Sequence, residues 1–245
     1  MSDDPIVISG AARTPMGGMM GSLAALTAAE LGALAIGRTV AAAGIANDAV
    51  DEVIMGNVLG AGQGQAPARQ AARGAGLVDA TSCLTINKMC GSGMKAVMLG
   101  HDLLKAGSIR TAIVGGMESM TNAPYLVPKG RTGYRFGHAE LLDHMALDGL
   151  EDAYEKRTPM GEFAERTVER YGFTREDQDA FAIESLRRAK LANEDGTFDA
   201  EVVPATIKSR KGDVTVQQDD QPFKSNPDKI PGLRPAFRKD GTISA

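Results

Sequence analysis

Over residues 5–116, short apolar runs alternate with segments whose apolar side chains recur at helical spacing. Short apolar runs bounded by turn residues are typical of strands buried on both faces of a parallel sheet. Strands that alternate with helices favour a mainly parallel sheet with right-handed crossovers. The expected strands are residues 5–10, 50–58, 82–86 and 111–116, and the expected helices are residues 27–44, 66–75 and 94–104.

The pattern changes after Glu118, because no further alternation of buried strand and helix follows. We therefore expect an α/β domain over residues 1–118 and a second, α+β domain over residues 119–245. Residues 122–156 are rich in Gly, Pro, Tyr and charge, and they predict a long excursion with a functional role. Two amphipathic helices, residues 161–171 and one capped at Thr174, are expected next, followed by a hairpin around residues 211–213.

Size and charge exclude several classes of protein. The chain has 245 residues, 43% of them apolar, which is enough for a full hydrophobic core. A formal net charge of -4 gives no electrostatic case for binding nucleic acid or an anionic membrane. The N-terminal residues form neither a basic region nor a long apolar run, so secretion and membrane insertion are not expected.

The cysteines and histidines indicate a reducing compartment and no metal. Cys83 and Cys90 lie in one extended segment, where their side chains cannot readily form a disulfide. A cytoplasmic location is the natural expectation. The three histidines show no metal-ligand spacing with each other or with a cysteine. We expect His101 to be a core residue of the buried helix, and His138 and His144 to lie in exposed loops.

Cys90 is the strongest candidate for a catalytic residue. It lies within four residues of an expected strand, and Gly91-Ser92-Gly93 then opens a helical pattern. Free backbone N–H groups and the positive end of the helix dipole gather at a helix N-terminus, and they favour an anion such as a thiolate. The thiolate is the nucleophilic form of cysteine. The alternative is a small core cysteine without chemistry.

One other motif and one basic cluster suggest ligand sites less specifically. The Gly60-x-Gly62-x-Gly64 run has the wrong spacing for a dinucleotide fingerprint, and it follows the second strand instead of the first. Basic side chains are close together at the expected hairpin, where they form either a solvated turn or a site that attracts a phosphate-bearing ligand. These side chains are Lys208, Arg210 and Lys211.

Longer motifs resemble the thiolase family, and most closely its acetyl-CoA acetyltransferases. Asn87-Lys88-Met89-Cys90-Gly91-Ser92-Gly93 is similar to the segment around the family's acyl-enzyme cysteine. Further similar segments run through the whole chain in the family's order. They are residues 8–15, 56–59, 67–72, 115–120, 160–165, 176–179 and 233–237.

The resemblance implies a thiolase-like N-terminal α/β half with an inserted loop domain that covers coenzyme A. It implies that Cys90 attacks the thioester of an acyl-CoA and holds the acyl group, with coenzyme A thioesters as substrates and no other cofactor. The ligand-contacting positions it implies are Leu150 and Met160 at the pantetheine and acyl channel, Lys224 at a phosphate, Phe237 at the adenine and Ala245 near the pantetheine. Each contact residue except Lys224 has an alternative role in the core of the loop domain, and the alternative for Lys224 is a residue that contacts no ligand.

The resemblance covers only part of the family's active site. The family's Gly-His-Pro and Cys-x-Gly-Gly-Gly motifs, which supply the groups for carbon–carbon bond chemistry, are absent from this sequence. The missing motifs lead us to expect that the chain needs a C-terminal half in cis or in trans, and the resemblance implies a homodimer or tetramer. The alternatives to an acetyl-CoA acetyltransferase are a degradative 3-ketoacyl-CoA thiolase and a non-catalytic CoA-binding half or subunit.

Overall fold

The structure of the protein, a computed structural model, describes residues 6–244, which form two compact units. The first unit contains the chain up to Pro124 together with Ala200–Gln218. The second contains Tyr125–Asp199 and the residues from Asp219 onward. The sequence instead suggested a single boundary at residue 118, with all later residues in one domain.

The return of Ala200–Gln218 to the first unit has a local cause. The backbone N–H of Arg13 donates to the carbonyl of Glu201 at 2.9 Å, and the N–H of Val203 donates to the carbonyl of Arg13 at 2.8 Å. The Arg13 side chain also pairs with the Glu201 carboxylate. The hairpin that follows, β6 (Ala205–Ile207) and β7 (Val214–Val216), is antiparallel as predicted.

The first unit is built on a three-stranded parallel sheet in the order β2-β1-β3. Its strands are β1 (Glu52–Gly56), β2 (Ser82–Ile86) and β3 (Ala112–Gly116). The central strand is buried on both faces, and Val53 and Ile54 have no exposed surface. This is the arrangement expected for a continuous apolar strand in a parallel sheet.

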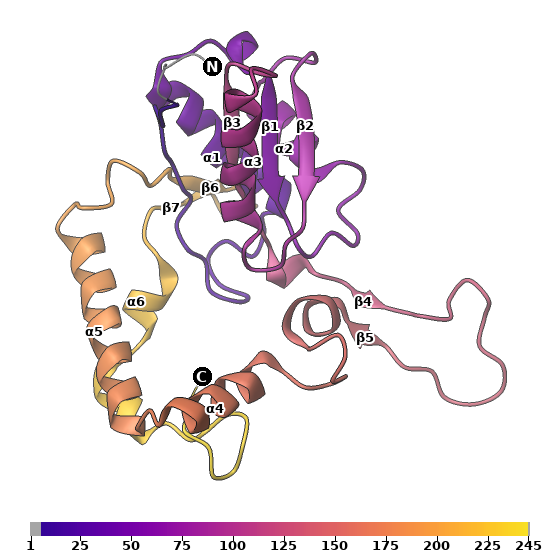
Figure 1. The fold of residues 1–245 in the computed structure, drawn as a ribbon, viewed down its shortest axis with the longest axis vertical. Coiled ribbons are helices and arrows are strands. Elements are labelled where there is room, and N and C mark those ends of the chain that lie inside the picture. Colours follow the sequence, from indigo (N-terminus) through magenta and orange to yellow (C-terminus); the bar gives the residue numbers. More distant parts are fainter. Residues whose placement is uncertain (1–5, 245) are drawn as a thin grey trace. The chain divides into compact units, whose positions relative to one another are not determined.

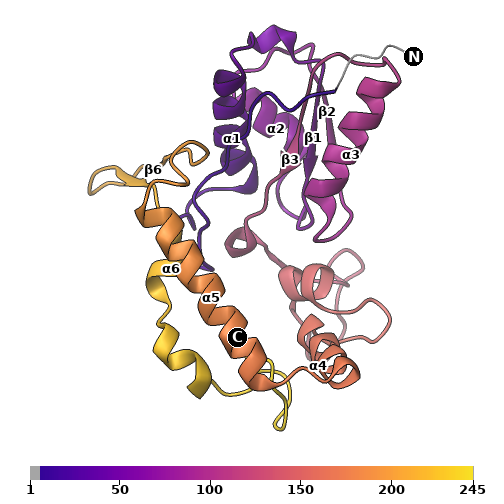
Figure 2. The same cartoon turned by 60° about the vertical axis from the view of Figure 1, so that its left-hand side comes forward.

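Helices cover both faces of this sheet. Figures 1 and 2 show α1 (Ala28–Ala43) and α2 (Pro67–Gly74) on one face and α3 (Ser92–Lys105) on the other. The predicted N-terminus of α1 is confirmed, because the side chains of Thr27 and Glu30 form a reciprocal capping box. The helix ends at Gly44, whose φ of 66° is the left-handed conformation that favours glycine.

Two apolar segments of the first unit are more exposed than their sequence predicts. Residues 6–10 form no strand, and Val7 and Ile8 are 71% and 85% exposed, while Pro5 lies outside the described residues. Helix α3, expected inside the molecule, exposes Met94, Val97 and Met98 on one side. An apolar segment is expected to be buried. Among the described residues, however, no strand pairs with residues 6–10 and no layer covers the outer side of α3.

The second unit is mainly helical. Its long helices are α4 (Met160–Tyr171) and α5 (Arg175–Glu194), and α5 begins with a capping box between Thr174 and Asp177. Both were predicted. The sequence did not predict the short antiparallel pair β4 (Tyr125–Leu126) and β5 (Leu142–Asp143), nor the short helix α6 (Asp220–Lys224).

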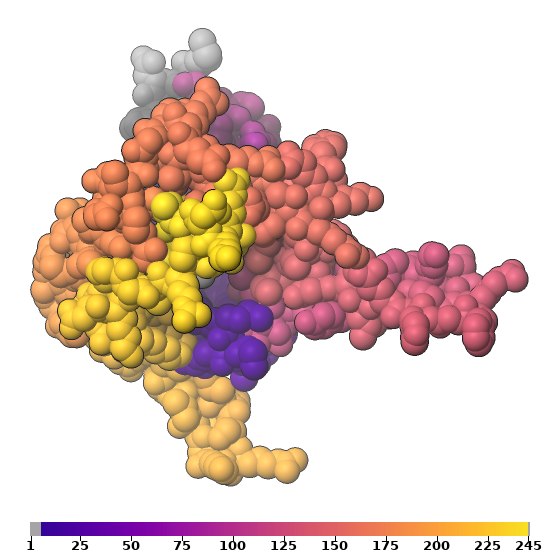
Figure 3. Space-filling view, turned by 90° about the horizontal axis from the view of Figure 1, so that it is seen from below, coloured from indigo at the N-terminus to yellow at the C-terminus, as the bar shows by residue number. Residues whose placement is uncertain are grey.

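Several short turns complete the helical content, and one long loop extends from the second unit. A π-helical turn spans Ala146–Leu150, and 3-10 turns span Asn47–Ala49, Met120–Asn122 and Pro227–Gly232. The loop between β4 and β5 projects as a narrow arm (Figures 1 and 3). Within residues 6–244, every helix is too short or too polar to cross a lipid bilayer.

The contact between β1 and α3 leads to a stability prediction. A Cβ on Gly56 would lie 2.6 Å from the Cβ of Ser92 and 2.8 Å from the backbone nitrogen of Gly93. We expect Gly56→Ala to lower the free energy of unfolding by about 1–3 kcal/mol, because backbone atoms cannot yield as a flexible side chain can. Urea unfolding measures the change.

Gly60→Ala is the matched control, because a Cβ there meets no atom within 4 Å. Its unfolding midpoint should stay close to that of the original chain. Equal midpoints for the two variants would show that α3 can move away from β1 without cost.

Candidate active site

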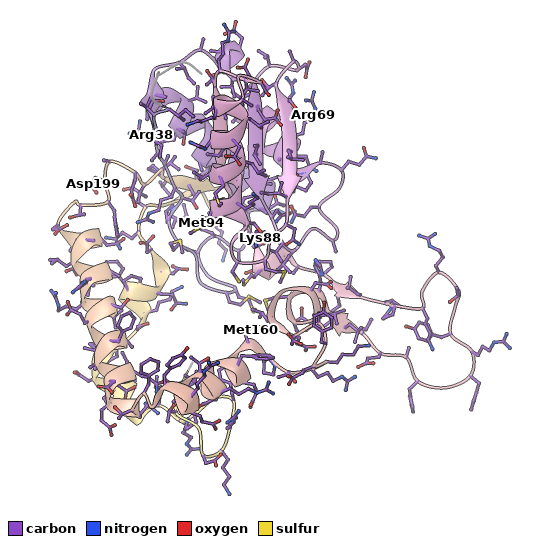
Figure 4. All side chains as sticks on the ribbon, in the orientation of Figure 1. Arg38, Arg69, Lys88, Met94, Met160 and Asp199 are labelled. Carbon is purple, nitrogen blue, oxygen red and sulfur yellow. The ribbon has the colours of Figure 1, made fainter. Side chains whose placement is uncertain are left out.

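Cys90 lies at the carboxyl end of the sheet, in the turn between β2 and α3. Gly91 is the N-cap residue of α3, and the Cys90 residue is exposed. Figure 4 labels Lys88 and Met94, which lie on either side of this turn near the first turn of α3. The structure therefore places the thiol at the helix N-terminus that the sequence predicted.

The turn is held in an unusual backbone conformation. Met89 has a φ of 49°, in the left-handed region that residues with a side chain seldom adopt. The Met89 N–H donates to Oδ1 of Asn87 at 2.9 Å. Residues held in such conformations persist only where their surroundings determine them, and they are often found at functional sites.

Ser92 supplies the second constraint on the turn. Its Oγ accepts a hydrogen bond from the Lys88 N–H at 2.8 Å and donates to the Met89 carbonyl at 2.5 Å. Its own N–H also donates to the Met89 carbonyl, at 3.0 Å. Ser92 is only 4% exposed, so the residue is part of the packed interior and cannot move freely. The turn that carries Cys90 is thus fixed from within.

Cys83 lies in a more buried environment than Cys90. It is half-buried, packs against the hydrophobic core of the first unit, and directs its Sγ to the Thr81 carbonyl at 3.6 Å. Burial raises the pKa of the Cys83 thiol, although nearby Arg69 opposes the shift. Both cysteines are free thiols, as the extended sequence between them predicted.

Three residues implied to contact coenzyme A lie close together in the second unit. Leu150 and Met160 adjoin the β-bridge between Glu151 and Pro159, Leu150 directly before Glu151 and Met160 directly after Pro159. The ring of Phe237 packs on the first turn of α4, where a Cβ on Gly161 would overlap the ring carbons. All three side chains are partly exposed, at 37–44%.

A buried carboxylate holds the C-terminal segment against α4. Glu165 is 3% exposed and accepts hydrogen bonds from the N–H groups of Thr242 at 2.9 Å and Ile243 at 2.8 Å. Arg238 pairs with Glu162 at 2.7 Å and also with Glu169. Figure 3 shows this segment, in yellow, lying against the orange helices. These contacts fix Phe237 on α4.

The remaining ligand position that the structure describes lies elsewhere in this unit. Lys224 is at the end of α6, where its Nζ pairs with Asp220 at 3.0 Å. Its implied phosphate contact stays a prediction. Ala245 lies outside the described residues.

Two of the three histidines differ from their predicted environments. His101 is exposed and contacts Asp102 at 3.2 Å, because it lies on the uncovered side of α3. His144 is 6% exposed, and its Nδ1 lies 2.6 Å from Oδ2 of Asp148 within the π-helical turn. His138 is exposed as expected. Among residues 6–244 there is no cluster of side chains able to hold a metal ion.

A family profile and individual relatives all match nearly the whole length of this chain. The sequence profile of the family described as "Thiolase, N-terminal domain" matches residues 6–245. An acetyl-CoA acetyltransferase of Cupriavidus necator is 47% identical over 98% of this chain, and one of Schizosaccharomyces pombe is 43% identical over 100% of it. The matches cover 61% and 62% of those relatives, so the chain spans less than two thirds of their length.

A solved structure is similar over the same range. It is the Acat5 thiolase from Ascaris suum in complex with coenzyme A, at 40% identity and a TM-score of 0.89. The match covers 97% of this chain and 60% of that one. The predicted fold class is thereby confirmed.

The two cysteines should differ in their reaction with iodoacetamide. We expect Cys90 to be alkylated first near neutral pH, because it is exposed, whereas burial limits access to Cys83 and raises its pKa. A raised pKa leaves less thiolate at a given pH, so labelling of Cys83 should become comparable only at higher pH. Peptide mass spectrometry after timed labelling measures both rates, and equal rates near neutral pH would contradict the assignment.

The Glu165 contacts predict how the C-terminal segment is anchored. Glu165→Gln keeps one acceptor oxygen but directs an NH₂ group at backbone N–H donors, and we expect it to cost about 1.5–3 kcal/mol. Cleavage by trypsin after Arg238 and Lys239 should become faster. Glu176→Gln, an exposed change on α5, is the control and should leave the cleavage rate unaltered.

Proposed function

Because this chain belongs to the thiolase family, we propose that it carries the acyl-transfer half of an acetyl-CoA C-acetyltransferase. The observation that carries the proposal is the exposed Cys90 in a fixed turn at the N-terminus of α3. The names of its relatives support acetyl-CoA as the substrate.

The covalent step follows from the position of Cys90. Its thiolate attacks the carbonyl carbon of acetyl-CoA, and the carbonyl oxygen becomes an oxyanion that backbone N–H groups at the start of α3 can stabilise. The intermediate collapses when the carbon–sulfur bond to coenzyme A breaks. CoA leaves as a thiolate that takes up a proton, and Cys90 keeps the acetyl group as a thioester.

Carbon–carbon bond formation needs groups that this chain does not carry. A base must remove a proton from the α-carbon of a second acetyl-CoA, and an acetylated cysteine cannot do so. The Gly-His-Pro and Cys-x-Gly-Gly-Gly motifs of the family are absent from the sequence. In the proposal a C-terminal half supplies these groups, in cis or in trans, and covers the exposed side of α3.

The second unit is proposed to bind coenzyme A. Leu150 and Met160 would contact the pantetheine, with Phe237 at the adenine, Lys224 at a phosphate and Ala245 near the pantetheine. The grouping of Leu150, Met160 and Phe237 around the first turn of α4 supports the assignment. The similar thiolase from Ascaris suum was itself solved in complex with coenzyme A.

The assembly and location are part of the proposal. A homodimer or tetramer is proposed, and the exposed apolar side chains of α3 agree with the need for a C-terminal half to cover them. A cytoplasmic location agrees with two free cysteines, since thiols persist in reducing compartments. Relatives that are named mitochondrial occupy another compartment.

Acetylation of Cys90 tests the proposal directly. Incubation with acetyl-CoA should add one acetyl group to the peptide that contains Cys90 and release free CoA thiol. Cys90→Ala should abolish both signals, whereas Cys83→Ala should retain them. Acetylation of the Cys90→Ala chain at the original rate would overturn the assignment.

A second arm of this experiment tests the acyl preference. The acetyl adduct should form faster than adducts from long-chain acyl-CoA donors. A reversed preference would favour a degradative 3-ketoacyl-CoA thiolase. CoA binding without any Cys90 adduct, even beside the C-terminal half of a relative, would favour a non-catalytic CoA-binding subunit.

A further inference from the structure

A buried polar residue joins the carboxyl ends of all three strands beside the Cys90 turn. Asn57, directly after β1, is 5% exposed. Its backbone N–H donates to the carbonyl of Ile86, the last residue of β2, at 3.0 Å. Its Nδ2 donates to the carbonyl of Met117 at 3.2 Å, directly after β3. One residue therefore ties together the ends of the central strand and both of its neighbours.

The carboxylate of Glu118 strengthens this junction. Oε1 accepts a hydrogen bond from Nδ2 of Asn57 at 2.7 Å and Oε2 accepts one from the Val58 N–H at 2.8 Å. The Leu59 N–H donates to Oε1 as well, at 3.2 Å. Hydrogen bonds to an ionised acceptor are stronger than those between neutral groups. Glu118 thus fixes the path of the chain where it leaves β1.

The junction connects to the Cys90 turn by two routes. Along the backbone, Ile86 is followed at once by Asn87, whose Oδ1 accepts the hydrogen bond from the strained Met89. From the side, Nδ2 of Asn87 makes a long contact of 3.5 Å with the carbonyl of Val58. Asn87 thus lies between the junction and the residue that precedes Cys90.

We propose that Asn57 and Glu118 are positioning residues for Cys90. They hold the ends of β1, β2 and β3 in register, and so keep Asn87 and Met89 where the Cys90 thiol faces the N-terminus of α3. This role rests on the proposed function, in which Cys90 is the nucleophile. Neither side chain is assigned a contact with the substrate.

Alkylation of Cys90 by iodoacetamide tests the proposal without any substrate, with Cys83 as an internal reference. Glu118→Ala should lower the ratio of the Cys90 rate to the Cys83 rate about fivefold, because a loosened turn no longer aims the thiol at the helix N-terminus. Glu118→Gln keeps an acceptor for the Val58 N–H, and should restore much of the ratio. Asn57→Ala should resemble Glu118→Ala.

Glu140→Gln is the matched control, because that carboxylate is exposed in the second unit and pairs there with the exposed guanidinium of Arg157. It should leave the ratio unchanged. A general loss of stability would raise the Cys83 rate, so a fall in the Cys90 rate with a constant Cys83 rate marks positioning. If Glu118→Ala does not fold, Glu118→Gln decides alone, with an expected decrease of about twofold.

Unchanged or increased ratios in the Glu118 and Asn57 variants would overturn the positioning role. That result differs from failure of the proposed function, which is the absence of an acetyl adduct on the original chain. Alkylation ratios can be read even where no acetylation occurs, so each proposal fails separately.

Discussion

The first turn of α3 lies directly against the carboxyl end of β1, with no side chain from the strand between them. Gly56 makes this approach possible, because a Cβ there would overlap Ser92 and the backbone of Gly93. Ser92, which lies at this contact, bonds to both Lys88 and Met89 and fixes the intervening turn. A methyl group at Gly56 would therefore press on the same residue that fixes the Cys90 turn.

Much of the local structure could be predicted from the sequence, because its causes are local. The capping box of Thr27 with Glu30, and that of Thr174 with Asp177, each involve residues three positions apart. Strand β1 was predicted because an apolar run of that length has few alternatives between turn residues. These features need no knowledge of what the segment packs against.

The incorrect predictions concern which residues are buried, and burial depends on partners that composition does not identify. Residues 6–10 have the composition of a strand, yet a strand forms only beside another, and composition does not identify its neighbour. His144 was predicted to lie in an exposed loop, but it is buried and pairs with Asp148, four residues further on. Cys90 itself could be identified from the sequence, because Gly91 and Gly93 follow it directly and indicate a turn before a helix. Two contacts could not be predicted from the sequence. The hydrogen bond between Asn57 and Glu118 depends on the register between β1 and β3, and the contact between Gly161 and Phe237 joins residues 76 positions apart.

The pairing of Arg13 with Glu201 and Val203 affects the order in which the chain can fold. Glu201 lies 188 residues after Arg13, so the segment around Arg13 finds this partner only after that length of chain has been synthesised. During that interval the parallel sheet and its three helices can assemble, because these elements themselves lie within residues 28–116. The segment around Arg13 can form these bonds only later. Until Glu201 and Val203 have been synthesised, the backbone of Arg13 lacks these partners, and a chaperone can protect the segment during that interval.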